Sequence, residues 1–167
     1  MTSENPKLGV AATLGVYGFT LDRFLGELHG AEIRTILDVR QRRGVRGSQY
    51  AWANSLRLQA SLAGAGVDYR HHPELAPTTE LRELQYREDA RHGVGKRSRV
   101  ELAPEFRERY TKEILDLVDL DDLLDGVTPG GPFALLCVEA DARACHRSIV
   151  AERLATEYGV VVSHLHP

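Results

Sequence analysis

Apolar and polar residues along this chain follow two periods in turn, and each change of period marks a predicted element. Short segments that are apolar or rich in β-branched residues predict strands, over residues 10–16, 33–39, 67–71, 132–138 and 160–165. Between them, apolar residues recur every three or four positions, which is typical of one face of a helix. The predicted helices cover residues 21–28, 52–63, 79–89, 106–117, 121–124 and 145–158.

The alternation of strands and helices predicts an α/β fold. Parallel strands joined by helical crossovers form a sheet that is covered on both faces. We therefore expect a three-layer sandwich with a mainly parallel sheet of about five strands and helices on both faces. Residues 1–167 are expected to form a single domain, with a flexible N-terminus over 1–8 and a mobile loop over 91–99, where glycines and basic residues concentrate.

The loops that follow the predicted strands carry most of the reactive side chains. In a parallel sheet, ligands bind beyond the carboxyl ends of the strands. Residues 38–46, 71–74 and 139–147 each follow a strand, so we expect all three segments to lie along one edge of the sheet.

Composition narrows the class of protein without naming a reaction. Hydrophobic residues make up 43% and charged residues 27% of the chain, and the net charge is -3. No apolar stretch approaches the roughly 20 residues that a membrane-spanning helix needs, and no signal-peptide layout is present, so we expect a cytoplasmic protein. Glycine-rich phosphate loops, dinucleotide fingerprints and nucleophile elbows are missing, which leaves the cofactor and the oligomeric state open.

The segment around Cys145 and His146 is the strongest candidate for catalysis. A cysteine beside a helix N-terminus favours the thiolate, and the neighbouring Arg143 and Arg147 are expected to lower its pKa further. His146 is then a candidate base or proton shuttle, and Glu139 and Asp38 are candidate acid–base groups. Cys137, in the middle of a predicted strand, is expected to be a core residue.

Basic residues in the same loops are candidates for binding an anion. The candidate anion- and substrate-binding residues are Arg40, Arg43, Arg46, Arg147 and His71. Guanidinium groups and a helix N-terminus suit phosphate or carboxylate. The expected partner is an anionic small molecule or a nucleic acid, with Tyr50 and Trp52 as candidate stacking rings.

Two other interpretations remain open. The arginine loop, residues 38–46, and residues 91–99 could form a non-catalytic nucleic-acid- or protein-binding module. Cys137, Cys145 and His146, with a further histidine, could instead bind a metal. No CxxC pair is present and adjacent Cys-His ligands are awkward to arrange around one ion, so we expect no metal site. A disulfide between the two cysteines is disfavoured in a reducing compartment.

Several motifs resemble one known family. They are Thr13-Leu14-Gly15, Ile36-Leu37-Asp38-Val39-Arg40, Gly66-Val67-Asp68-Tyr69, Glu74-Leu75, Leu135-Leu136-Cys137-Val138-Glu139, Cys145-His146-Arg147-Ser148 and Val162-Ser163-His164. On these residues the chain resembles the domain of unknown function 488 family. The resemblance implies a compact α/β domain without an assigned activity. Val16-Tyr17 and Ala76-Pro77 depart from the family's pattern, which puts the pocket near those residues in doubt.

Overall fold

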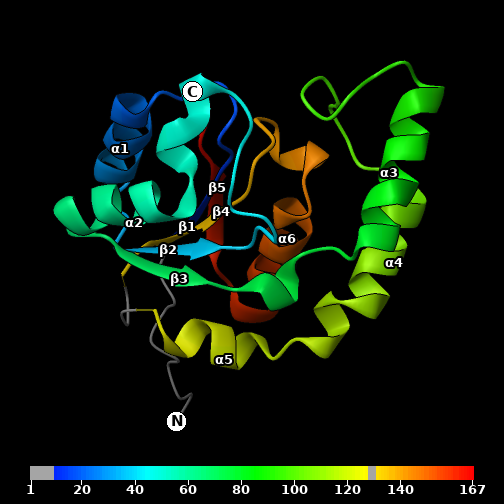
Figure 1. The fold of residues 1–167 in the computed structure, drawn as a ribbon. Helices are drawn as coiled ribbons and strands as arrows, with labels where there is room; N and C mark the ends of the chain where they lie inside the picture. Colours follow the sequence, from blue (N-terminus) through cyan, green and yellow to red (C-terminus); the bar gives the residue numbers. More distant parts are fainter. Residues whose placement is uncertain (1–9, 128–130) are drawn as a thin grey trace, which may run out of the picture.

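Five parallel strands form one sheet in the computed structural model, in the order β3-β2-β4-β1-β5 (Figure 1). The structure describes residues 10–127 and 131–167, so the flexibility predicted for residues 1–8 lies outside the described residues. The strands are β1 (Val10–Leu14), β2 (Thr35–Asp38), β3 (Asp68–His71), β4 (Phe133–Leu136) and β5 (Val161–His164). In the register of the central strands, Leu135 of β4 lies between Thr13 of β1 and Leu37 of β2.

The helices cover the two faces of this sheet. They are α1 (Leu21–Gly30), α2 (Ser55–Gly64), α3 (Thr79–Arg91), α4 (Pro104–Glu113), α5 (Leu120–Asp125) and α6 (Arg147–Tyr158). Short 3₁₀ turns occupy Ser48–Ala53, Pro73–Leu75, Leu115–Leu117 and Ala142–Ala144. None of the described helices combines the length and apolarity that crossing a bilayer requires.

Alternation along the strands produces two separate cores. Ile36 and Leu136 point to the face covered by α1 and α2, where they join Phe24 and Leu58 in one cluster. Leu37, Leu135 and Phe133 point to the opposite face and pack with apolar residues of α4, α5 and α6. A parallel sheet needs such cover because both of its faces are apolar. The predicted three-layer α/β fold is confirmed.

The predicted helix ends agree with the structure to within one or two residues, except in the helices predicted over residues 52–63 and 106–117. The helix predicted over residues 52–63 begins only at Ser55, because residues 48–53 form a 3₁₀ turn and Asn54 is extended. Trp52 packs against Phe24, with ring centroids 5.0 Å apart, and so belongs to the edge of the core. The helical face predicted to include Leu117 is wrong: α4 ends at Glu113, and the side chain of Leu117 is 78% exposed.

The carboxyl ends of all five strands lie at the same edge of the sheet, because every pairing is parallel. The loops after β2, β3 and β4 therefore meet there, as predicted. His146 shows the closeness directly, since its Nε2 lies 3.1 Å from the carbonyl oxygen of Val39.

A buried ion pair fixes the first of these loops. Asp38 accepts hydrogen bonds from the backbone N–H and the Nε of Arg40 at 3.1 and 2.9 Å, and its second oxygen accepts from the Nη2 of Arg40 at 2.9 Å. Tyr69 donates a further hydrogen bond to that second oxygen at 2.5 Å. Arg40 also donates to the carbonyl of Ala53 at 3.0 Å. The pair thus joins β2, β3 and the 3₁₀ turn before α2.

Replacing Asp38 with asparagine should destabilise the fold by about 3–5 kcal/mol, because it leaves the buried Arg40 guanidinium without a counter-charge. The matched control is Asp68→Asn, which removes the same charge from an exposed position on β3 and should cost no more than about 0.5 kcal/mol. Urea denaturation of the three proteins measures both values. Equal stabilities for the two variants would contradict the anchoring role of Asp38.

Candidate functional site

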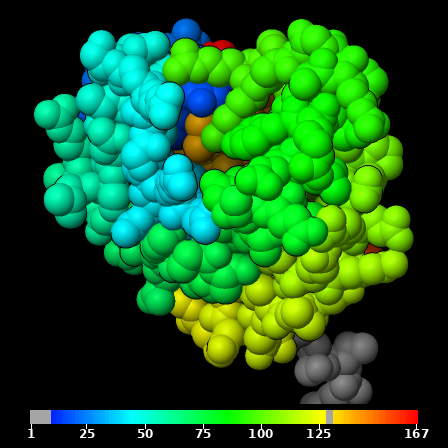
Figure 2. Space-filling model, turned by 45° about the vertical axis from the view of Figure 1, so that its right-hand side comes forward, coloured from blue at the N-terminus to red at the C-terminus, as the bar shows by residue number. Residues whose placement is uncertain are grey.

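A cavity of about 640 Å³ opens where the loops after β1, β2 and β4 meet the segment that follows α3. Residues 40–42 and 44–46 form one wall, and residues 95–99 with Arg82, Gln85 and Tyr86 form the other. Figure 2 shows the hollow between the cyan arginine loop and the green segment after α3, with orange residues of the loop after β4 at its base. The cavity therefore lies at the edge where parallel sheets bind ligands.

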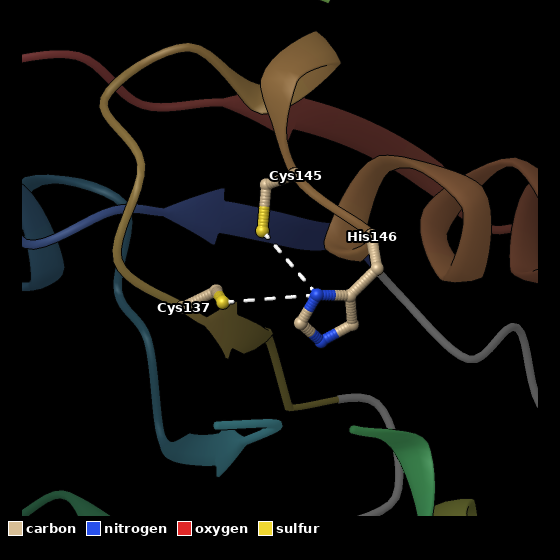
Figure 3. A group of neighbouring side chains, drawn as sticks. All are labelled: Cys137, Cys145 and His146. Carbon is tan, nitrogen blue, oxygen red and sulfur yellow. Dashed lines mark hydrogen bonds between the residues drawn. The ribbon is translucent and has the colours of Figure 1, made fainter. Parts of the chain in front are cut away.

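Three side chains meet at the floor of the cavity (Figure 3). Cys137 directly follows β4, and Cys145 and His146 directly precede α6. The Nδ1 of His146 lies 3.7 Å from the Sγ of Cys145 and 3.9 Å from the Sγ of Cys137. Both cysteines are free thiols, so the disulfide considered from the sequence is not formed. Cys137 is buried in the hydrophobic core, as predicted, and its position directly after β4 also brings it into this cluster.

The surroundings of the two thiols separate their acidities. Burial raises the pKa of Cys145. The hydrogen bond from the Cys137 thiol and the positive charges of His146 and Arg147 lower it by more, so the pKa lies well below its usual range. The hydrogen bond with Cys145 and burial raise the pKa of Cys137 well above its usual range. Negative charge in this pair is thus favoured on Cys145. Arg143, predicted to assist, is exposed and pairs with Asp141 at 2.9 Å, so it makes no such contribution.

Glu139 adds a buried carboxyl group to the cavity wall. One of its oxygens accepts a hydrogen bond from Arg99 at 3.1 Å, whereas the other, Oε2, is buried without a partner among the described residues. Burial and then the neighbouring Cys145 raise the pKa of Glu139, against the opposing effects of Lys96 and Arg99. A carboxyl group in this position can donate or accept a proton inside the cavity.

A buried network connects Glu139 to the opposite wall. Arg99 donates to Asp89 of α3 at 2.9 Å as well as to Glu139, and Gln85 donates to Asp89 at 2.8 Å. All four side chains are at least nine-tenths buried. The network joins Arg99, at the end of the segment 91–99, to the loop after β4. For the rest of that segment, residues 91–98, the predicted mobility stays a prediction. No local signal identifies Arg99, because its partner Glu139 lies 40 residues away in sequence.

Most of the charged side chains around the cavity are basic. Beyond Arg40 and Arg99, which pair with buried acids, the basic residues that line it are Arg42, Arg46, Arg82, Lys96 and Arg97. None of these five forms an ion pair with a described acidic residue, and Glu139 is the single acidic residue among the lining residues. Arg97 lies over the rings of Tyr17 and Tyr50, with its guanidinium carbon 4.9 and 5.7 Å from their centroids. The cavity is therefore strongly cationic, although the whole chain carries a net charge of -3.

The structure brings together only part of the predicted site. Glu139, Cys145, His146, Arg40 and Arg46 line the cavity. Asp38, Arg43, His71 and Arg147 lie outside the lining residues, so no contact with the cavity supports the roles predicted for them. Arg43 donates to the hydroxyl of Tyr69 at 3.4 Å, and the Nε2 of His71 lies 2.7 Å from the carbonyl oxygen of Arg40. Basic side chains of residues 82–99 line the cavity in their place. The only sequence signal for this role was the concentration of arginines and lysine in that stretch.

Two contacts hold the loop after β4 in place. Arg147 is fully buried and donates to the backbone carbonyl of Glu139 at 2.7 Å. On the other side, the backbone N–H groups of Val16 and Tyr17 both donate to the carbonyl of Val138 at 2.9 Å. This crossing is so close that a Cβ atom on Gly15 would lie 1.7 Å from the carbonyl oxygen of Glu139. Glycine is required at position 15 for this reason.

A comparison with protein families supports the resemblance found in the motifs. The family model described as Domain of unknown function DUF488 matches residues 20–154, which is most of the chain. The matched range includes the arginine loop, the segment after α3 and the whole loop after β4. Neither the curated proteins nor the solved structures yielded a match.

Substituting alanine for Gly15 should displace the loop that carries Glu139 and destabilise the protein by about 1–3 kcal/mol or more. Gly26 is a suitable control, because it lies inside α1 with open space around its Cα, and Gly26→Ala should stabilise the protein by about 0.5–1 kcal/mol. Thermal unfolding gives the two signs. A Gly15→Ala protein as stable as the wild type would show that the crossing can relax.

Proposed function

The chain belongs to the DUF488 family of domains of unknown function, and from its cavity we propose that it is an enzyme that binds and transforms a phosphate-bearing substrate. The observation that carries the proposal is the presence of two features in one cavity. Basic side chains that form no ion pair with a described acidic residue line its wall together with the carboxyl group of Glu139, and two thiols and one imidazole form its floor. Residues that can bind an anion and residues that can transfer a proton or react with the substrate thus line the same cavity.

The basic wall suits a multiply charged anion. Arg42, Arg46 and Lys96 reach the cavity from both sides and have no acidic partner among the described residues. Guanidinium and ammonium groups bind phosphate through charge-assisted hydrogen bonds, and a partly enclosed site strengthens them because water screens the charges less. Lys96 is half-buried at this wall, so its charge is only partly solvated.

A nucleotide is the phosphate-bearing class that fits the wall best. Tyr17 lines the cavity beside the basic side chains, and the ring of Tyr86 on α3 also lines it while remaining 44% exposed. Aromatic rings beside basic groups can stack a base while the phosphates bind to the cations. The two predicted stacking residues contribute less, since Trp52 packs against Phe24 at the edge of the core and neither Trp52 nor Tyr50 is among the lining residues.

Glu139 is the group we assign to proton transfer. Its Oε2 atom is buried and unpaired among the described residues, while Arg99 holds the other oxygen in place. A carboxyl group that is fixed on one side and free on the other can exchange a proton with a substrate oxygen or a water molecule. His146 and the two cysteines complete the reacting end of the cavity.

The binding part of the proposal predicts a specific charge effect. Lys96→Gln should weaken binding of ADP by roughly tenfold or more, because a charge-assisted hydrogen bond contributes about 1.5–3 kcal/mol. Arg91→Gln removes the same charge from the same segment, but Arg91 is exposed, pairs with Glu88 and does not line the cavity, so affinity should change little. Isothermal titration calorimetry with ADP and adenosine measures both effects. Equal losses in the two variants, or equal affinity for adenosine, would contradict a phosphate site in the cavity.

The catalytic part requires a second measurement. Release of inorganic phosphate from a panel of nucleotides and sugar phosphates should be detectable with the wild type and fall by roughly 100-fold or more in Glu139→Gln, since proton transfer by a side chain contributes about 10²–10⁴-fold. The variant should retain ADP binding, because the glutamine oxygen can still accept the hydrogen bond from Arg99 and the basic side chains of the wall are the same. Binding without any turnover in the wild type, together with tight, salt-sensitive binding of single-stranded oligonucleotides, would instead support the non-catalytic nucleic-acid-binding interpretation.

A further inference from the structure

The three side chains at the cavity floor have the spacing of ligands around one metal ion. Zinc lies about 2.3 Å from sulfur and about 2.0–2.1 Å from nitrogen, which separates the two ligand atoms by about 3.6 Å at the tetrahedral angle. The sulfur-to-nitrogen distances observed here are 3.7 and 3.9 Å. The donor atoms of Cys137, Cys145 and His146 all lie within 4.8 Å of one another. A small movement of each side chain would therefore close them around an ion.

The other nitrogen of His146 supplies independent support. Its Nε2 lies 3.1 Å from the carbonyl oxygen of Val39, and a carbonyl oxygen can only accept, so Nε2 carries the proton. In the neutral ring, Nδ1 then presents its lone pair to the two sulfur atoms. Metal-binding histidines almost always fix their orientation in this way, by donating the second N–H to a carbonyl or carboxylate.

The local backbone removes the objection raised by the sequence. Adjacent cysteine and histidine residues normally point in different directions, but Cys145 is extended at φ -135° and ψ 145° whereas His146 is helical at φ -59° and ψ -22°. The change of conformation between them turns both side chains toward Cys137, as Figure 3 shows. Only the junction between the 3₁₀ turn at 142–144 and α6 creates this arrangement.

We propose that Cys137, Cys145 and His146 bind one zinc ion at the floor of the cavity. Two thiolates and one imidazole are a donor set suited to zinc. No fourth cysteine, histidine or carboxylate among the described residues belongs to this group, so the fourth coordination position is left to water or substrate. Since all three ligands line the cavity, that position opens into it.

An open fourth position is typical of catalytic rather than structural zinc sites. A bound ion would sit beside the basic wall and could accept a phosphate oxygen or a water molecule. That use of the metal rests on the function proposed above, whereas the metal site itself does not. In this arrangement Cys145 is a ligand instead of the nucleophile expected from the sequence.

The experiment begins with the reduced, metal-free protein and adds cobalt(II), whose absorption reports its ligands, and then zinc. We expect one ion per chain, the charge-transfer bands of cobalt–thiolate bonds, visible bands of tetrahedral cobalt, and displacement of cobalt by zinc. X-ray absorption of the zinc-bound protein should show two sulfur ligands and one imidazole ligand. Cys145→Ser and His146→Gln should weaken zinc binding by at least the roughly 100-fold that loss of an outer-shell partner can cost.

His92→Gln is the matched control, because His92 is exposed at the end of α3 and far in sequence from the cluster, and it should bind zinc like the wild type. Circular dichroism checks that each metal-free variant is folded. If a cysteine variant does not fold, the ligand count in the wild type still decides the question. Failure to bind a stoichiometric ion, absence of thiolate ligands, or binding unaffected by both substitutions would overturn the proposal.

Titration of the metal-free protein with ADP separates this proposal from the proposed function. ADP binding that depends on Lys96 in a protein that binds no zinc would reject the metal site alone. If the three residues bind zinc but the protein does not bind ADP, the phosphate site alone is rejected.

Discussion

The buried guanidinium of Arg99 is the interaction on which the cavity depends. It lies between two carboxylates, Asp89 on α3 and Glu139 on the loop after β4, and is 7% exposed. Among the described residues, the other hydrogen bond from a charged side chain of residues 91–98 to the edge of the sheet is exposed: Arg97 donates to the carbonyl of Arg46 in the loop after β2 at 3.3 Å. Burying three charged groups is costly, and here the shared hydrogen bonds of one guanidinium offset that cost. The wall that carries Lys96 and Arg97 is held against the sheet as a result.

The same interaction shapes the electrostatics of the cavity. Arg99 occupies one oxygen of Glu139, and no other basic residue of the wall forms an ion pair with this carboxyl group among the described residues. Arg42, Arg46 and Lys96 consequently keep their charge available to a ligand. The protein thus combines an acidic overall composition with a local concentration of positive charge, which suits recognition of a particular anion better than general attraction to polyanions.

The loop after β4 is under a second, steric constraint. Its backbone crosses Gly15 at a distance that excludes any side chain there, and Arg147 holds its carbonyl groups from below. These contacts place Glu139 near the basic wall while directing Cys145 and His146 toward Cys137. The reactive groups thus lie on the loop after β4, whereas the basic side chains line the same cavity from the loop after β2, from α3 and from the segment after it. A ligand that is held by the wall would meet the thiols and imidazole without any rearrangement of the sheet.

The sequence by itself determined the elements and the edge at which the site lies, because both follow from local periodicity and from the rule that parallel strands end together. Thr20 caps α1 and Gly159 ends α6 with φ 66°, as their types predict. Only the tertiary structure decided which side chains face the cavity. Cys137 is a core residue as predicted, but only the packing of distant segments placed its sulfur 3.9 Å from His146, and Arg99 gained its role from partners 10 and 40 residues away. Such contacts depend on how distant segments pack, and no local pattern encodes that.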